Sequence, residues 1–172
     1  MVCGWHLRLG PVSGSGGRWR DRLSPSRKES AMTQKSVAEL AKEQVIAYNE
    51  KDWDRARAAF APEIVYEEVG THRKVKGVDD VLTTWKGWAK AIPDSRATFQ
   101  SEIVSGNTAV LEITWSGTHN GPLNTGDREI PPTGKKIELR AIQVVDVAND
   151  KVKSVRQYFD MGTLLHQIGA DH

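Results

Sequence analysis

Cysteine is almost absent from this 172-residue chain, and the single one, Cys3, lies near the N-terminus. One thiol cannot close an internal disulfide, and residues 32–172 offer neither a thiolate metal ligand nor a cysteine nucleophile. The sequence also lacks an apolar run long enough for a secretory signal or a membrane-spanning helix. We therefore expect a soluble, cytoplasmic protein with no membrane partner.

Several signature motifs are missing as well. The chain contains no phosphate-binding loop, no dinucleotide glycine fingerprint, no His-Glu-x-x-His helix and no Gly-x-Ser-x-Gly turn. These absences exclude the usual nucleotide enzymes, zinc proteases and serine hydrolases. The function therefore has to be argued from a pocket.

Charge is distributed unevenly along the chain. Residues 1–31 contain six of the 24 Lys and Arg residues and two of the 22 acidic residues, a net of +4, so residues 32–172 carry a net of −2. The basic character therefore belongs to the N-terminal segment. We expect no nucleic-acid partner, because nucleic-acid binding needs basic residues clustered on a folded surface.

The composition of residues 1–31, rich in Gly, Ser, Arg and Pro, predicts a disordered basic leader. Met32 lies directly before the first helix signal, so we place one domain over residues 32–172. An Arg-rich segment with few acids is also typical of a mitochondrial or plastid transit peptide, which is the alternative interpretation.

Helical signals dominate the start of the domain. Ser36 and Glu39 have the spacing of a capping box, and apolar residues then recur at helical spacing to about residue 49. Asp52 is a candidate N-cap for a second short helix, which Pro62 would end.

A third helix is expected over about residues 81–92, after a short strand at residues 64–66 and a polar loop. Its apolar stripe includes Trp85 and Trp88, for which core packing is the simplest role.

Alternating patterns then predict a meander of antiparallel strands and a final short helix, over residues 97–105, 108–118, 136–147, 151–160 and 164–168. Helices followed by such strands indicate an α+β fold. We expect a cone-shaped, curved antiparallel or mixed sheet wrapped over the N-terminal helices, enclosing a pocket.

The last hairpin decides which side chains share a face of that sheet. If Asn149-Asp150 is a two-residue turn, Ala148 pairs with Lys151, and an unbroken register places Asp146 opposite Lys153. This register predicts one mixed face, made of Leu139, Ala141, Gln143, Arg156, Tyr158 and Asp160. It predicts an opposite, apolar face, made of Ile142, Val144, Val155 and Phe159.

The spacing leaves two roles open for Asp160. The residue precedes the last helix and is a suitable N-cap for it. Alternatively, the mixed face lines the interior of the cone and Asp160 is a partly desolvated base.

Four segments in register carry a family resemblance: Ile92-Pro93-Asp94, residues 117–122 (Gly-Thr-His-Asn-Gly-Pro), residues 132–135 (Pro-Thr-Gly-Lys) and Tyr158-Phe159-Asp160 before residues 164–169. Together they resemble the SnoaL-like polyketide cyclases and the related bacterial ester cyclases, which belong to the nuclear transport factor 2-like superfamily. The resemblance covers nearly all of residues 36–169.

The resemblance implies a homodimer formed through the sheet, with no metal and no organic cofactor. It also implies an acid–base enzyme that acts on a small carbonyl-containing metabolite, in the family's case closing a ring by intramolecular aldol condensation. Asp160 matches the family's carboxylate general base, and His119 matches its histidine-containing segment. The remaining pocket candidates, as donors or wall residues that bind substrate, are Gln143, Arg156, Tyr158, Trp85 and Trp115.

Some features depart from the family or stay open. Arg156 occupies a position where the family often has Trp, and Gln143 is the one polar residue on the proposed pocket face of its strand. In an unbroken register of the preceding hairpin, His119 would face Asp94, whereas a bulge would break that alignment. A loop-end histidine bonded to the backbone is the other reading of His119.

Three alternative functions remain: a non-catalytic ligand-binding or dimerisation module, an epoxide hydrolase, and a ketosteroid-isomerase-like enzyme. The epoxide hydrolase would need an Arg held between two acids, and Arg156 lies about 13 Å from Asp160 along the strand. The substrate itself is not readable from the sequence.

Overall fold

Helices precede most of the strands, in the order expected of an α+β protein. The computed structural model describes residues 35–126 and 128–171, so the leader expected over residues 1–31 lies outside the described residues. The helices in the described part are α1 (Val37–Glu50), α2 (Trp53–Ala59), α3 (Val78–Ala91) and α4 (Met161–Ile168), with a 3-10 turn η1 (Val69–Thr71).

A six-stranded sheet with strand order β2-β1-β8-β7-β4-β3 forms the second layer. Its strands are β1 (Phe60–Glu68), β2 (Arg73–Lys76), β3 (Arg96–Ser105), β4 (Thr108–Thr118), β7 (Lys136–Ala148) and β8 (Lys151–Phe159). The short strands β5 (Leu123–Asn124) and β6 (Glu129–Ile130) pair with each other. Within the six-stranded sheet, β1 and β8 run parallel and the other neighbours antiparallel, so the sheet is mixed.

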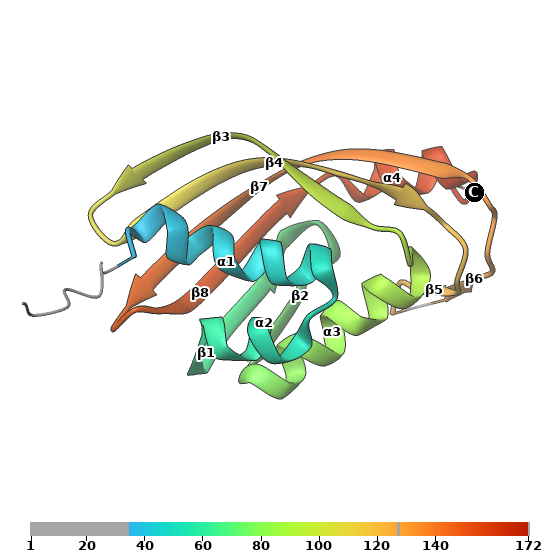
Figure 1. Ribbon diagram of the computed structural model, residues 1–172. Coiled ribbons are helices and arrows are strands. Elements are labelled where there is room, and N and C mark those ends of the chain that lie inside the picture. The colour runs from blue at the N-terminus through green and yellow to red at the C-terminus, as the bar shows by residue number, and fades with distance from the viewer. Residues whose placement is uncertain (1–34, 127, 172) are drawn as a thin grey trace, which may run out of the picture. The chain divides into compact units, whose positions relative to one another are not determined.

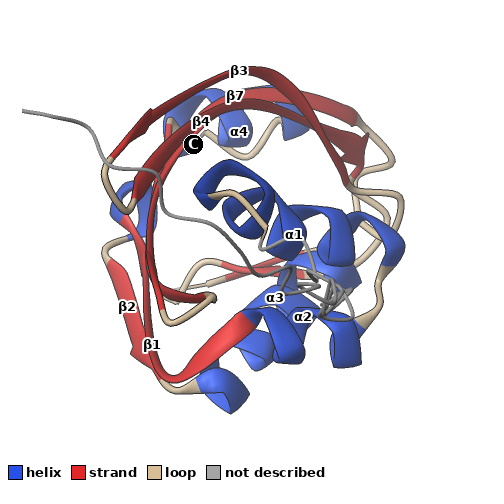
Figure 2. Ribbon diagram, turned by 60° about the vertical axis from the view of Figure 1, so that its left-hand side comes forward, coloured by secondary structure: helices blue, strands red, loops and turns tan. Residues whose placement is uncertain are grey.

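The sheet curves round α1. Figure 2 shows β3, β4 and β7 arching over α1, while β1 and β2 stand to its side and α2 and α3 lie beneath it. α4 lies beside β7 (Figure 1). The predicted fold, a curved mixed sheet over N-terminal helices, is confirmed.

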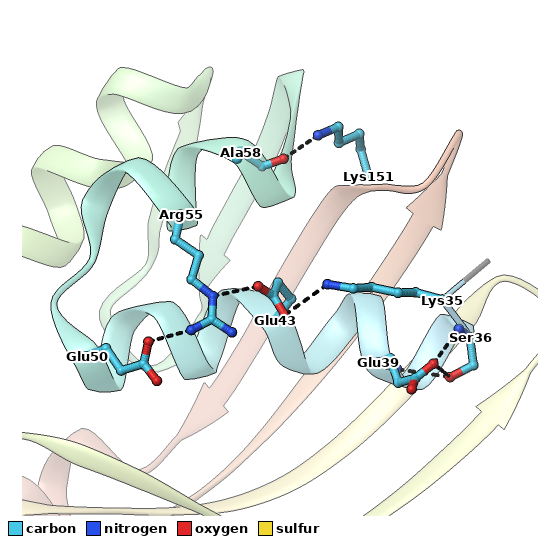
Figure 3. Close-up of polar contacts among 8 residues, drawn as sticks. All are labelled: Lys35, Ser36, Glu39, Glu43, Glu50, Arg55, Ala58 and Lys151. Atoms are coloured by element: carbon cyan, nitrogen blue, oxygen red, sulfur yellow. Dashed lines mark hydrogen bonds and ion pairs between the residues drawn. The ribbon is translucent and has the colours of Figure 1, made fainter. Parts of the chain in front are cut away.

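Polar contacts fix α1 along its exposed side (Figure 3). The predicted capping box is present, because Ser36 Oγ accepts from the Glu39 amide at 3.2 Å and Glu39 accepts from the Ser36 amide at 2.7 Å. Arg55 of α2 donates to Glu43 of α1 at 2.6 Å. Lys51 then ends α1 in the left-handed conformation, with φ 55°.

The first strand is longer than residues 64–66, and β2, which follows the predicted polar loop, was not predicted. Pro62 lies inside β1, where the register with β8 shifts between Phe60 and Val65. A residue without an N–H suits a place where the ladder is interrupted.

A bulge in β3 changes the predicted partner of Asp94. Ser105 pairs with Thr108 as expected, but the register shifts between Phe99 and Ser101. Asp94 therefore accepts hydrogen bonds from Thr118, at 2.6 Å from its amide and 2.9 Å from its hydroxyl, rather than facing His119.

A second bulge overturns the predicted faces of β8. Ala148 pairs with Lys151 as predicted, but the register then shifts, and Asp146 pairs with Ser154 instead of Lys153. Ser154 and Thr108 both donate to the Asp146 carboxylate at 2.6 Å. Because side chains alternate along a strand, the one-residue shift exchanges the two faces of β8.

Candidate functional site

The concave side of the sheet and the facing helices enclose a cavity of about 60 Å³. Its walls are mostly apolar, with aromatic side chains of Tyr48, Tyr66, Trp85, Trp88, Trp115 and Phe159. Aliphatic side chains complete these walls, from Val45, Ile92, Ile137, Leu139 and Leu164. Four polar side chains also line it, those of Gln44, Ser95, Gln143 and Gln157.

The aromatic side chains hold one another edge to face. Tyr48 packs against Trp85 and Trp115, with ring centroids 5.5 and 5.1 Å apart. Such contacts fix ring orientation as well as burying area. Trp85 and Trp115, which the sequence offered as substrate-binding residues, thus both lie in the cavity wall.

A chain of three glutamine amides crosses one end of the cavity. Gln44 Nε2 donates to Ala41 O at 3.2 Å and to Gln143 Oε1 at 2.7 Å. Gln143 Nε2 in turn donates to Gln157 Oε1 at 2.6 Å. The Ala41 carbonyl fixes the orientation of the whole chain, because only an amide nitrogen can donate to it.

This chain leaves unpaired groups at the cavity. Gln44 Oε1 is buried without a hydrogen-bond partner among the described residues, and so is the Trp115 indole nitrogen. Buried polar groups are nearly always satisfied, so these atoms mark where a ligand or water would bind.

Away from the glutamines, the polar part of the cavity wall is formed by the hydroxyls of Tyr48 and Ser95, and Lys51 contacts Ser95. The Tyr48 and Ser95 hydroxyls share a hydrogen bond of 2.9 Å. Lys51 Nζ donates to Ser95 O at 2.7 Å and to Ser95 Oγ at 3.2 Å. Burial raises the pKa of Tyr48 to about 12, and burial lowers the pKa of Lys51 to about 8 although Asp94 opposes that shift.

A buried carboxylate supports two of the aromatic side chains. Glu68 is fully buried and accepts from Trp88 Nε1 at 2.6 Å and from the Tyr66 hydroxyl at 3.1 Å. Thr71 and Arg73 donate to its other oxygen, at 2.9 and 3.2 Å. With four donors around it, Glu68 holds Tyr66 and Trp88 in place.

Asp160 does not line the cavity. It is the exposed N-cap of α4, where it accepts from the Gly162 amide at 2.9 Å and from the Thr163 hydroxyl at 2.5 Å. The Thr163 hydroxyl and the Gly162 amide lower the pKa of Asp160, the opposite of the desolvation expected for a base. The geometry of Asp160 agrees with the predicted role as the N-cap of the last helix.

Arg156 and Tyr158 were predicted to face the cavity, and this prediction is wrong. After the bulge, Arg156 pairs with Val144 and Tyr158 with Ile142, on the outer face of the sheet. Arg156 lies 3.7 Å from Asp146 in an ion pair, and Tyr158 is 42% exposed. Their places in the cavity belong to Gln157 and Phe159, so Phe159 was also assigned to the wrong face.

His119 is fully buried beyond the end of β4 and does not line the cavity. Its Nδ1 hydrogen-bonds the Thr133 hydroxyl at 3.0 Å, and its carbonyl accepts from the Gly134 amide at 2.9 Å. Burial lowers its pKa, and among the described residues Nε2 has no partner. His119 thus ties two loops together.

The nearby Gly121 shows why this segment needs glycine. Its amide donates to Ala91 O at 2.9 Å, and a Cβ there would lie 1.9 Å from the Lys90 carbonyl oxygen. Any other residue would push the loop away from the end of α3.

Of the predicted site residues, Gln143, Trp85 and Trp115 line one cavity. Sequence reasoning missed Gln44, Tyr48, Lys51, Ser95, Gln157 and Glu68. Gln44 carried a usable signal, since it is a polar residue between Ala41 and Val45 on the apolar stripe of α1 and is 0% exposed.

Two further features bear on the kind of site. Among residues 35–126 and 128–171, no three His, Cys, Asp or Glu side chains are grouped so as to hold a metal ion. No helix in the same ranges is long and apolar enough to cross a membrane.

Several solved structures with the same fold come from bacterial proteins. AclR, a proposed hydroxylase from Streptomyces galilaeus, is 26% identical, with a TM-score of 0.66 over 78% of this chain and 83% of AclR. TsrD from Streptomyces laurentii is 25% identical, with a TM-score of 0.66 over 78% of this chain and 95% of TsrD. IdmH, a proposed polyketide cyclase from Streptomyces antibioticus, is 22% identical, with a TM-score of 0.68 over 78% of this chain and 99% of IdmH.

None of the curated proteins matches the chain. The sequence profile of the SnoaL-like polyketide cyclases, however, matches residues 38–168, which is most of the 172-residue chain and includes the whole cavity wall. The chain belongs to the SnoaL-like polyketide cyclase family.

Proposed function

We propose that this protein is a cytoplasmic enzyme that binds a small carbonyl-containing metabolite in its cavity and performs acid–base chemistry on it without a cofactor. The observation that carries the proposal is the pairing of an apolar wall with unpaired polar atoms, Trp115 Nε1 and Gln44 Oε1. Because Trp115 Nε1 can only donate, it suits a carbonyl oxygen or an enolate oxygen.

The size of the cavity supports a small substrate. Its volume is about 60 Å³, whereas one water molecule needs about 10–15 Å³ of cavity. The enclosed part of the substrate is therefore about four to six heavy atoms. A fused polyketide of several rings would require the aromatic walls to move.

The same cavity also supports the second candidate, a ligand-binding module without catalysis. The observation that favours it is Asp160, whose carboxylate caps α4 instead of facing the cavity. The epoxide hydrolase alternative loses its support, because Arg156 pairs with Asp146 on the outer face.

Binding can be tested with cyclopentanone and its hydrocarbon counterpart methylenecyclopentane, by calorimetric or NMR titration of the full chain. We expect Trp115→Phe to weaken cyclopentanone binding by about 2- to 10-fold, the effect of one lost hydrogen bond, and to leave the hydrocarbon unchanged. Trp53→Phe is the matched control, since Trp53 contacts Tyr48 but does not line the cavity.

Equal affinity of the wild-type protein for the two probes would overturn the carbonyl assignment. Selective ketone binding without any proton exchange at the carbon beside the carbonyl would favour the module.

We also propose that the protein is a homodimer, formed through the outer face of the sheet. Ile103 and Ile142 are 68% and 44% exposed, and cross-strand pairing places Ile142 next to Tyr158. An exposed apolar surface of this kind supports an interface with a second copy of the chain.

A further inference from the structure

Lys51, Ser95 and Tyr48 connect the cavity with the outside of the domain. Tyr48 and Ser95 line the cavity, and Lys51 is half-buried at the end of α1. Ser95 Oγ lies 2.9 Å from the Tyr48 hydroxyl and 3.2 Å from Lys51 Nζ, so it bridges the two. We propose that these three residues form a proton relay in which Tyr48 is the catalytic residue at the substrate and Lys51 is the terminal base, acting through Ser95.

The backbone holds this relay rigidly. Asn49 of α1 donates to Ala97 O at 2.8 Å and accepts from Ala97 N at 2.7 Å, which fixes the start of β3 against the end of α1. Lys51 Nζ donates to Ser95 O at 2.7 Å. These bonds hold the backbone around Ser95 against the end of α1.

The charges around Lys51 suit a base. Burial lowers its pKa to about 8, with Asp94 raising it and Arg96 lowering it, so a useful fraction of the amine is neutral near pH 8. The carboxylate of Asp94 is held by Thr118 at 2.6 Å. The Tyr48 ring lies 4.0 Å from Lys51 Nζ and offers no charge of its own.

Each step of the relay conserves atoms and electrons. The C–H bond beside the substrate carbonyl breaks, and its proton passes to the Tyr48 oxygen as the Tyr48 proton passes to Ser95. The Ser95 proton passes to the neutral Lys51 amine, which becomes an ammonium. The electron pair stays on the substrate as an enolate, next to the unpaired donor Trp115 Nε1.

The relay then runs in reverse to complete a ring closure. The enolate carbon forms a bond to a second carbonyl carbon of the same molecule, and the resulting alkoxide takes the proton back from Lys51 through Ser95 and Tyr48. Lys51 is neutral again, and no oxidant, reductant or co-reactant is consumed. The relay thus supplies the base that the position of Asp160 does not.

This inference rests on the proposed function. Two measurements distinguish a failure of the relay from a failure of the proposed function. The first is deuterium exchange at the carbons beside the carbonyl of cyclopentanone, followed by NMR. We expect the wild-type rate to rise with pH and to level off above about pH 8, because the neutral form of Lys51 is the active one.

Conservative variants test each member of the relay. Tyr48→Phe, Ser95→Ala and Lys51→Arg should each lower the exchange rate by about 10² to 10⁴, the range for losing a general base. Lys51→Arg keeps the charge but cannot become neutral, so its remaining rate should not vary between pH 7 and 9. Lys86→Arg is the control, because Lys86 lies over Trp53 and away from the cavity.

The second measurement is an NMR titration of the Lys51 amine in the protein without ligand. A midpoint near 8 supports the relay, and a midpoint near the ordinary value of 10.5 overturns it. Exchange that survives in Tyr48→Phe and Ser95→Ala would also overturn the relay while leaving the proposed function intact. A wild-type protein that binds cyclopentanone without exchanging it would overturn the catalytic proposal itself.

Discussion

Gln143 donates its amide nitrogen to Gln157 at 2.6 Å, from directly opposite positions on β7 and β8. This contact exists because the bulge at Lys153 of β8 brings Gln157, and not Arg156 or Tyr158, to the concave side of the sheet. The bond joins the last hairpin to Gln44 of α1 through a single chain of amides.

Breaking this series of glutamine hydrogen bonds should destabilise the protein. Gln157→Leu would leave the buried Gln143 Nε2 without an acceptor, so the free energy of unfolding should fall by about 1–3 kcal/mol in urea denaturation. Arg156→Leu, one position away on the outer face, is the matched control and should cost about 0.5 kcal/mol or less. Equal effects of the two variants would show that the register described for β8 is incorrect.

Asp160 should behave as a helix cap. Asparagine is also a good N-cap, so Asp160→Asn should leave both the melting temperature and cyclopentanone exchange unchanged. Asp160→Ala should lower the melting temperature by about 2–6 °C with activity intact. A loss of exchange of about 10² or more in Asp160→Asn, with stability unchanged, would instead establish the general-base role.

The lowered pKa of Asp160 also predicts how its contribution to stability changes with pH. A carboxylate whose pKa is lowered on folding stabilises the fold above its unfolded value, and the contribution disappears as pH falls through the folded value. The difference in melting temperature between wild type and Asp160→Ala should therefore shrink at strongly acidic pH. A difference that grows on acidification would contradict the cap.

Replacing Glu68 should destabilise the protein more than replacing the neighbouring Glu67. Glu68→Gln places an amide nitrogen where four donors converge and leaves Arg73 without its buried partner, so unfolding free energy should fall by about 2–4 kcal/mol. Glu67→Gln is the matched control, because Glu67 pairs with Lys74 at 3.4 Å on the surface and should cost less than about 1 kcal/mol. Chemical denaturation of both variants provides the comparison.

A homodimer should sediment at about 38 kDa, twice the 19.1 kDa of one chain. Ile142→Glu should convert it to a monomer at micromolar concentration without unfolding it, since a charge would have to be buried in the interface. Val104→Glu is the control, because Val104 is 46% exposed but follows Ile103 on β3, so its side chain lies on the opposite face of the sheet. A single species near 19 kDa for the wild-type protein would exclude the dimer.

Local signals in the sequence determined the elements of this fold. Ser36 with Glu39 marked the start of α1, Asp52 the start of α2, and Asn149-Asp150 the last turn, and all three are as predicted. These features depend on contacts within a few residues, so the sequence alone contains the information. The four segments that resemble the SnoaL-like family likewise predicted the curved α+β fold.

Tertiary structure decided which side chains share the cavity. Neither bulge is marked in the sequence by glycine or proline, since the unpaired residues are Gln100 and Lys153. Each bulge shifts the register by one residue, and side chains alternate with a period of two, so a single inserted residue moved Arg156 and Tyr158 out and Gln157 in. In the proposed relay, Ser95 lies 44 positions from Lys51 and 47 from Tyr48 along the chain, and only folding could bring it to them.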